Sequence, residues 1–253
     1  MRVTILGCGG SFGVPLIGGH WGACDPGNPK NRRRRVSILV EEGGTTLLVD
    51  TGPDMREQLL DAGVKHIDAV LYTHAHADHS HGLNDLRSLA YHMGRPIDIY
   101  GNQATLDDLT TSFAYAFRQD EHAVYKRIAV AHQIDGPLRL GGIDVVPFEQ
   151  EHGFGATTLG FRFGAMAYST DAVELDEAAF AALAGVDVWI VDCLRYEPHP
   201  THAHFERTLA WIARVKPRRA VLTHMNQALD YEELRRRCPP GVEPGYDGLV
   251  IEV

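Results

Sequence analysis

The 253-residue sequence has few cysteines, no excess of positive charge and no long apolar run. Its four cysteines are widely spaced and form no Cys-x-x-Cys pair, which argues against a disulfide framework or a cysteine-rich zinc knuckle and suits a reducing compartment. Lys and Arg number 24 against 33 Asp and Glu, giving a net charge of −9. This balance does not favour broad binding to nucleic acid or to an anionic membrane.

Residues 3–24 carry no formal charge, but glycines and Pro15 interrupt this stretch. It therefore lacks the continuous apolar run of a signal peptide or a membrane-spanning helix. The apolar fraction of 44% is that of a globular protein. We expect one cytoplasmic α/β domain spanning residues 1–253, with no membrane partner.

Short β-branched runs alternate with segments of helical spacing. Strands are predicted at 3–6, 36–40, 45–49, 69–72, 128–132, 143–148, 158–163, 166–169, 188–191, 220–223 and 249–253. Helices are predicted at 56–62, 83–91, 104–117, 175–183, 205–215 and 231–237. Gly43-Gly44 predicts a hairpin turn, and 18–35 reads as a long loop. Sheets covered by helices follow from this order.

Histidine is abundant, with 14 residues, and four ligand-type side chains stand together directly after the apolar run 69–71. His74 and His76 are two residues apart, so an extended backbone would point both the same way. Asp78 and His79 follow in a turn before the next helix. Two histidines can hold one cation while the Asp-His pair faces another, and zinc and manganese both accept such mixed ligands.

Three more ligand-type residues stand at or beyond the ends of predicted strands. His152 follows the strand at 143–148, Asp171 follows 166–169, and His224 follows 220–223. One edge of the sheets would collect these side chains beside the first cluster. Each alone could be a surface residue, but beside the first cluster we expect the three to complete the ligands of a two-metal site.

The His-x-His-x-Asp-His pattern, with the later His, Asp and His in order, resembles the metallo-β-lactamase superfamily. The resemblance implies a four-layer αββα sandwich with two divalent metal ions, Mn²⁺ or Zn²⁺, at its edge. The resemblance also assigns the ligands. His74, His76 and His152 would bind the first metal, and Asp78, His79 and His224 would bind the second. Asp171 would bridge both metals, and Asp50 would orient a ligand histidine. A helix or turn cap is the alternative for Asp50.

The opening Leu6-Gly7-Cys8-Gly9-Gly10-Ser11 resembles the phosphodiesterase branch of that superfamily, which includes phosphoribosyl cyclic phosphodiesterases and tRNA 3′-processing endonucleases. Its glycines would let backbone N–H groups approach a phosphate, with Ser11 as a substrate-binding residue, although an ordinary tight turn would also use them. The implied chemistry is attack by a metal-bridging hydroxide, with Asp78 both ligand and catalytic residue.

In that branch a histidine at the head of a late helix protonates the leaving oxygen. His204, with Glu206 two residues on, matches this pattern best, and His202 is the competitor. The tail around Tyr246 and Asp247 resembles a segment that closes over the site, where both residues either touch substrate or pack.

Two features of the loop at 18–35 remain. The phosphonate-pathway enzymes carry a cysteine cluster there for a structural zinc, whereas only Cys24 is present here, so we expect no third metal. Arg32 to Arg35 form the one basic cluster, either a solvated loop or a patch that guides phosphate to the entrance.

The combined reading is a metal-dependent phosphodiesterase acting on a small ribose or nucleotide phosphodiester, cyclic ones included. A tRNA 3′-processing endonuclease is the first alternative, but the chain shows no basic arm between Asp78 and Asp171. A carrier role related to quinone-cofactor biosynthesis is another, and a lactamase or thioesterase follows. A homodimer is compatible with the sequence.

Overall fold

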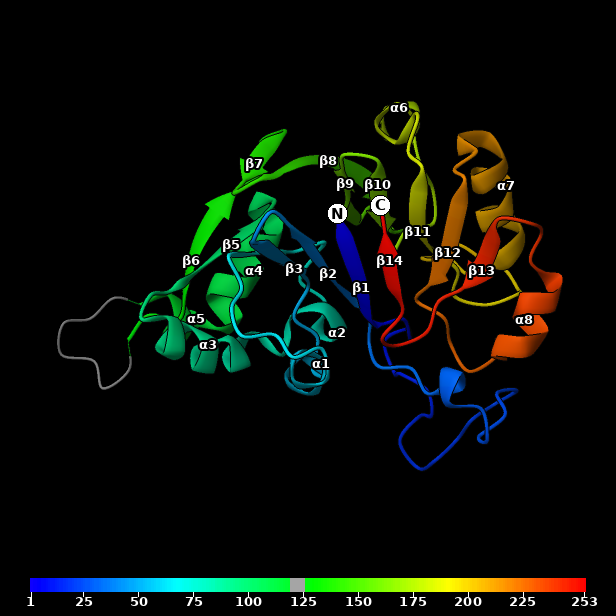
Figure 1. The fold of residues 1–253 in the computed structure, drawn as a ribbon, viewed down its shortest axis with the longest axis horizontal. Helices are drawn as coiled ribbons and strands as arrows, with labels where there is room; N and C mark the ends of the chain where they lie inside the picture. The colour runs from blue at the N-terminus through cyan, green and yellow to red at the C-terminus, as the bar shows by residue number, and fades with distance from the viewer. Residues whose placement is uncertain (119–125) are drawn as a thin grey trace.

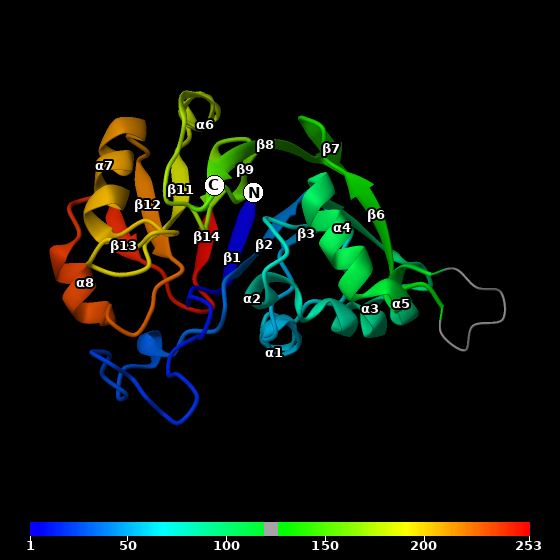
Figure 2. The same ribbon diagram turned by 180° about the vertical axis from the view of Figure 1, so that it is seen from behind.

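The computed structural model describes residues 1–118 and 126–253. Within them, two sheets of seven strands stack face to face, and helices cover the outer faces (Figure 1, Figure 2). The predicted αββα sandwich is confirmed. One sheet contains β1 (Arg2–Gly7), β2 (Ser37–Glu42), β3 (Thr45–Val49), β4 (Ala69–Leu71), β5 (Ile97–Gly101), β6 (Ala129–Gln133) and β14 (Val250–Glu252). The other contains β7 (Leu138–Leu140), β8 (Ile143–Glu151), β9 (Thr157–Phe163), β10 (Met166–Ser169), β11 (Val188–Asp192), β12 (Arg219–Thr223) and β13 (Val242–Pro244).

The helices form two groups on opposite sides of the sheets (Figure 1). The first group is α1 (Met55–Asp61), α2 (Ala77–Ser80), α3 (Leu86–Met93), α4 (Gln103–Ser112) and α5 (Ala114–Phe117), with the 3-10 turn η2 (Leu83–Asp85). The second is α6 (Glu177–Leu183), α7 (Phe205–Val215) and α8 (Tyr231–Arg237). A further 3-10 turn, η1 (Pro29–Asn31), lies in the long loop.

The central strands supply apolar side chains to two layers at once. In β3, Leu47 and Val49 enter the core between the sheets, whereas Leu48 packs in the cluster that includes residues of α1 and α3. Successive strand residues point to opposite faces, so a strand covered on both sides has apolar residues at consecutive positions. All five residues of β3 are buried.

The direction of the strands brings the segments that form the site to one edge of the sandwich. β2 and β3 pair antiparallel through Gly43-Gly44, whose positive φ values suit the predicted hairpin turn. From β3 to β6 and from β10 to β13 the strands are parallel. The ends of β3 and β4 are level, with Val49 beside Leu71. The ends of β10, β11 and β12 are level too, with Ser169 beside Val191 and Val191 beside Leu222. The segments that follow these strands therefore emerge at one edge.

The sequence prediction missed four short elements and joined others. It gave no element at α2, β5, β7 or β13, which have three to five residues each. Such runs are too short to display a period. The helix predicted at 104–117 is broken, because Phe113 leaves helical geometry at φ −118° between α4 and α5.

The basic cluster is neither a solvated loop nor a free phosphate-guiding patch. Arg33 is buried, with 2% of its surface exposed, and its guanidinium donates to the carbonyl oxygens of Asn226 at 3.0 Å and Leu229 at 2.6 Å. Cys24 lies beside it and donates to the same carbonyl of Leu229. Arg33 thus ties the long loop to the segment that follows β12.

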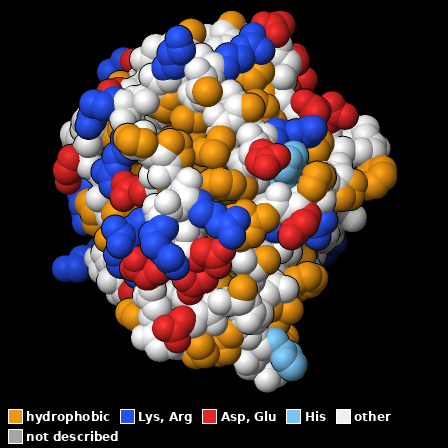
Figure 3. Space-filling view, turned by 90° about the vertical axis from the view of Figure 1, so that its right-hand side faces the viewer, with side chains coloured by type: hydrophobic (Ala, Val, Ile, Leu, Met, Phe, Trp, Pro, Cys, Tyr) orange, Lys and Arg blue, Asp and Glu red, His pale blue; other side chains and the backbone are white. Residues whose placement is uncertain are grey.

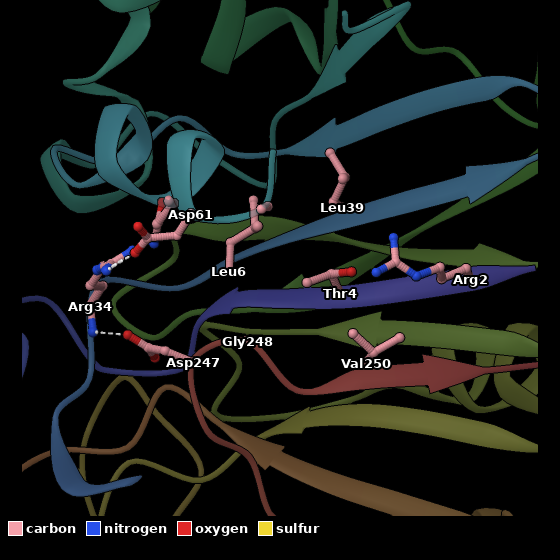
Figure 4. A pocket seen from close by; sticks show the side chains of 11 residues that line it. Arg2, Thr4, Leu6, Arg34, Leu39, Asp61, Asp247, Gly248 and Val250 are labelled. Atoms are coloured by element: carbon pink, nitrogen blue, oxygen red, sulfur yellow. Dashed lines mark hydrogen bonds and ion pairs between the residues drawn. The ribbon is translucent and has the colours of Figure 1, made fainter. Parts of the chain in front are cut away.

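The next two residues, Arg34 and Arg35, are paired with acidic side chains. Arg34 lies between Asp61 and Asp247 at the rim of a cavity of about 330 Å³ (Figure 4). Arg35 pairs with Asp54 through its Nε atom at 3.0 Å. Since both charges are matched locally, neither provides an unpaired cation for substrate.

No helix among residues 1–118 and 126–253 is long and apolar enough to cross a membrane. On the face formed by α7 and α8, basic and acidic side chains intermix and do not gather into a patch of one sign (Figure 3). Arg237, for example, pairs with Glu233 four residues earlier on α8.

We predict that Arg33→Met lowers the free energy of unfolding by about 2–4 kcal/mol, because two buried carbonyls lose a charged donor. The same substitution at the exposed Arg32 should change it by no more than about 0.5 kcal/mol. Urea unfolding followed by circular dichroism measures both. Equal midpoints for the two variants would contradict the structural role of Arg33.

Candidate active site

Residues at the carboxyl ends of the parallel strands converge on one cluster. Asp50 follows β3, Asp171 follows β10 and His224 follows β12, and all three adopt positive φ values of 55–64°. This conformation is costly for residues with a Cβ atom and concentrates at functional sites. The sharp turn at each strand end directs a polar side chain toward the same edge of the sandwich.

The first group of donors is made of His74, His76 and His152. Their ligand atoms all lie within 4.8 Å of one another. His152 Nε2 is 3.4 Å from His76 Nδ1, and its Nδ1 is 2.9 Å from the carbonyl oxygen of Thr201. That carbonyl accepts the Nδ1 proton, so Nε2 is left with a lone pair facing the cluster.

The second group is Asp78, His79, Asp171 and His224, again within 4.8 Å. Asp171 Oδ2 lies 3.1 Å from His79 Nε2 and 3.4 Å from His224 Nε2. Asp78 Oδ2 lies 3.4 Å from His79 Nε2 and 3.7 Å from His224 Nε2. Nitrogen and oxygen donors thus face one another from three segments.

Asp171 belongs to both sides of the cluster. While its Oδ2 faces the second group, its Oδ1 lies 3.9 Å from the Nε2 atoms of both His74 and His152. A carboxylate in this position has one oxygen for each donor group, which is the arrangement of a bridging ligand.

The buried charges shift the protonation of these groups strongly. Burial alone would raise the pKa of Asp171, but His224 and His79 outweigh it and hold that pKa well below its usual value. Burial alone would lower the pKa of His224, yet Asp171 and Asp78 raise it to about 9. Burial and the neighbouring His79 lower the pKa of His74. A divalent cation would take the place of the protons on these rings, because metal ligands bind in their deprotonated form.

Asp50 lies behind the cluster and is fully buried. Its Oδ2 is 2.8 Å from His79 Nδ1, and its oxygens accept from the backbone N–H and the hydroxyl of Thr73. Asp50 therefore orients the His79 ring, and the turn-cap alternative does not describe its contacts.

His202, and not His204, is brought into the cluster. His202 is buried, stacks on His224 with ring centroids 4.6 Å apart, and places Nδ1 3.7 Å from Asp171 Oδ1. His204 is the N-cap of α7, half-buried, and its backbone pairs with Arg195. His204 has an extended backbone where the chain enters α7. His202, two residues earlier, is therefore the histidine that lies at the site.

The other predicted residues occupy different places. Glu206 is exposed in the first turn of α7, where a carboxylate favours the helix dipole. Ser11 lines a pocket that also contains His202. Tyr246 packs against Lys30 and Tyr231.

Asp247 has a structural role in the contacts that the structure gives it. Its Oδ1 accepts from the backbone N–H of Cys8 at 3.1 Å and its Oδ2 from that of Arg34 at 2.8 Å (Figure 4). Burial raises its pKa to about 6. Of the two alternatives for Asp247, these contacts fit packing, because both oxygens join the opening loop to the long loop; its substrate contact stays a prediction.

Sequence reasoning missed Asp192, the last residue of β11. Its Oδ2 accepts from the backbone N–H of Ala172 at 3.1 Å and lies 3.4 Å from His202 Nδ1. The rule that found His152, Asp171 and His224 applies here as well, since Asp192 is an acid at the end of a buried strand.

Known proteins match this arrangement. The family model described as a beta-lactamase superfamily domain matches residues 45–225. An octanoyltransferase of Porphyromonas gingivalis is 33% identical over 98% of this chain, but the chain spans only 51% of that relative. A ribonuclease Z of Methanopyrus kandleri is 30% identical over 49% of this chain and 43% of its own length.

A solved structure described as a new diphosphatase from the PhnP family is 35% identical. It has a TM-score of 0.92 and covers all of this chain and 97% of its own. This likeness extends over both sheets and the strand-end cluster between them. The chain is a hydrolase-fold protein that belongs to the metallo-β-lactamase superfamily, in the branch that contains the PhnP and ribonuclease Z proteins.

Proposed function

We propose that this protein is a metal-dependent phosphodiesterase that hydrolyses small phosphodiesters and uses His202 to protonate the leaving oxygen. The observation that carries the proposal is the position of His202. It lies against the shared carboxylate Asp171 and at the same time lines a pocket that opens beside the cluster.

The residues present suit two divalent cations, Mn²⁺ or Zn²⁺. Several donor atoms are buried without a hydrogen-bond partner among the described residues, including Nε2 of His74, His79 and His224 and Oδ2 of Asp78. Such orphaned atoms are costly unless something binds them. His74, His76 and His152 would hold one cation, Asp78, His79 and His224 the other, and Asp171 both. When bound, such cations supply a nucleophile from water at neutral pH and stabilise charge on a phosphoryl group.

His202 has the contacts that a proton donor needs. Nδ1 faces Asp192 Oδ2 at 3.4 Å and Asp171 Oδ1 at 3.7 Å, so two carboxylates hold the orientation of the ring. His199 lies on its other side, with ring centroids 5.2 Å apart. An alkoxide is a poor leaving group and needs a proton from a group placed in this way.

The relatives support phosphoryl chemistry more than acyl transfer. The diphosphatase and ribonuclease Z names both describe attack at phosphorus, and the diphosphatase match covers the whole chain. This chain spans only 51% of the octanoyltransferase, so the activity named for that relative has no weight in the proposal. The net charge of −9 and the paired arginines favour a small substrate over tRNA.

We predict that Asp171→Ala reduces bound metal from about two ions per chain to one or none, because both donor groups lose the carboxylate they share. Elemental analysis after gel filtration measures the stoichiometry. The exposed Asp176, the N-cap of α6, provides the control, and Asp176→Ala should retain both ions. Two tightly bound ions in Asp171→Ala would contradict the bridging role.

We predict that His202→Ala lowers kcat by about 10²–10⁴ on thymidylyl-(3′→5′)-thymidine, whose leaving group is an alkoxide. The loss should be much smaller on bis(p-nitrophenyl) phosphate, because p-nitrophenolate departs without a proton. Steady-state kinetics on the two substrates, with metal content verified, measure the difference.

His204→Ala is the matched control and should change both rates by no more than about twofold. Two results would overturn the assignment of His202: equal losses on the two substrates, or a larger leaving-group effect in His204→Ala. Absence of any metal-dependent hydrolysis of bis(p-nitrophenyl) phosphate by the unsubstituted protein would overturn the proposed function itself.

A further inference from the structure

The hairpin between β8 and β9 has a histidine of the metal cluster at its first loop position and an exposed phenylalanine at its apex. The loop 152–156 follows the last residue pair of the two strands. The N–H of His152 donates to the carbonyl of Ala156 at 2.8 Å and closes the base of this loop. The N–H of Ala156 donates to the carbonyl of Gly153 at 2.9 Å, which closes a tight turn with Phe154 at its centre.

Phe154 is an unfavourable residue for this turn. Its φ is +52°, and that of Gly155 is +80°. Two central residues with positive φ are the pattern of a type I′ turn, which favours Asn, Asp or Gly at these positions. The Cβ atom of Phe154 makes the left-handed region costly, and its ring offers no local hydrogen bond to offset that cost.

The ring of Phe154 also gains little from packing, because 89% of the residue is exposed. A single exposed aromatic side chain is common on protein surfaces and indicates no function on its own. Here the exposure and the backbone strain occur in the same residue, and neither stabilises the fold. Strain of this kind concentrates at sites that bind a ligand.

The turn lies beside the metal cluster. A Cβ atom at Gly153 would come within 2.4 Å of the carbonyl oxygen of Pro200, so the turn packs directly against the segment that contains His202. Phe154 is two residues from His152, which places their Cα atoms no more than about 7 Å apart. A substrate held at the cluster is therefore within reach of the Phe154 ring.

The charges beside the turn indicate which group of a substrate the ring would meet. The groove that adjoins the turn at Gly155 and Ala156 has a volume of about 470 Å³. Four acidic residues line this groove: Glu149, Glu151, Glu174 and Asp176. Carboxylates repel a further phosphate but accept hydrogen bonds from N–H groups. The favoured group is therefore an uncharged planar ring with N–H donors, as in a nucleobase.

We propose that Phe154 stacks on a nucleobase of the phosphodiester substrate and determines the preference for substrates that carry one. This inference rests on the proposed function. Stacking on an aromatic face would favour the substrate with a base by about 5- to 100-fold over the same substrate without it. The exposed ring provides the face, and the hydrogen-bonded turn holds it beside the cluster. Phe154 is then a specificity residue with no part in bond cleavage.

Two esters with the same leaving group test the proposal. One is the p-nitrophenyl ester of thymidine 5′-phosphate, and the other is that of 1,2-dideoxyribose 5-phosphate, which lacks the base. Since p-nitrophenolate departs from both without a proton, the comparison does not depend on His202. The kcat/KM of the unsubstituted protein should be about 5- to 100-fold higher for the thymidine ester.

In Phe154→Leu the ratio of the two kcat/KM values should fall to near one, whereas Phe154→Tyr retains an aromatic ring and should keep the ratio. Tyr91→Leu is the matched control, because Tyr91 on α3 is 86% exposed, and it should also keep the ratio. A ratio that persists in Phe154→Leu, or a ratio near one in the unsubstituted protein, would overturn the proposal. So would a dimer in gel filtration that only Phe154→Leu abolishes, with the ratio unchanged.

Phe154→Asn separates substrate recognition from a role in folding. Asn tolerates the left-handed backbone and removes exposed apolar surface, so this variant should melt about 2–4 °C higher than the unsubstituted protein. Its ratio of kcat/KM values should nevertheless fall to near one. A lower melting temperature would show that the ring supports the fold, contrary to the proposal.

A binding measurement distinguishes failure of this inference from failure of the proposed function. In calorimetric titrations, thymidine 5′-phosphate should bind more tightly than 1,2-dideoxyribose 5-phosphate, and Phe154→Leu should bind the two equally. Base-dependent binding through Phe154 without hydrolysis of either ester would overturn the proposed function alone. Hydrolysis of both esters without preference for the base would overturn this inference alone.

Discussion

The site depends on one buried carboxylate placed among histidines. Asp171 is 1% exposed, yet its two oxygens face five imidazole rings from four separate segments of the chain. An unpaired charge at this depth would be prohibitively costly, so the rings and the carboxylate require one another. A divalent cation at this place would compensate the carboxylate and would bind the ring nitrogens in their deprotonated form.

The sandwich brings these groups together through strand direction. Parallel strands in both sheets end at the same edge, and left-handed residues at Asp50, Asp171 and His224 turn the chain sharply there. Behind this edge, the Asp50 contact fixes His79, and Arg33 and Asp247 join the flanking loops. The backbone strain at the edge is thus supported by buried polar networks on both sides.

The sequence predicted the layers and most of the ligand group because both follow short-range rules. Apolar runs located the central strands, and polar residues placed just after them located His74, His152, Asp171 and His224. Asp192 obeys the same rule and could have been found. The short elements α2, β5, β7 and β13 could not, because each is brief and contains a charged residue that interrupts any apolar run.

The sequence could not show which charged side chains pair, or which of two nearby histidines lies at the site. Arg32 to Arg35 look like one basic cluster, but tertiary contacts bury Arg33 and match Arg34 and Arg35 with acids. His202 and His204 are two residues apart, and only the chain path into α7 decides which one meets Asp171. Both answers depend on contacts between segments distant in the sequence.

The central claim is that Asp171 joins two cation sites at this edge. Anomalous diffraction from crystals grown with Mn²⁺ or Zn²⁺ would test it most directly. We predict two peaks, one among His74, His76 and His152 and one among Asp78, His79 and His224, with Asp171 between them. A single peak, or peaks that leave Asp171 unbound, would contradict this account of the site.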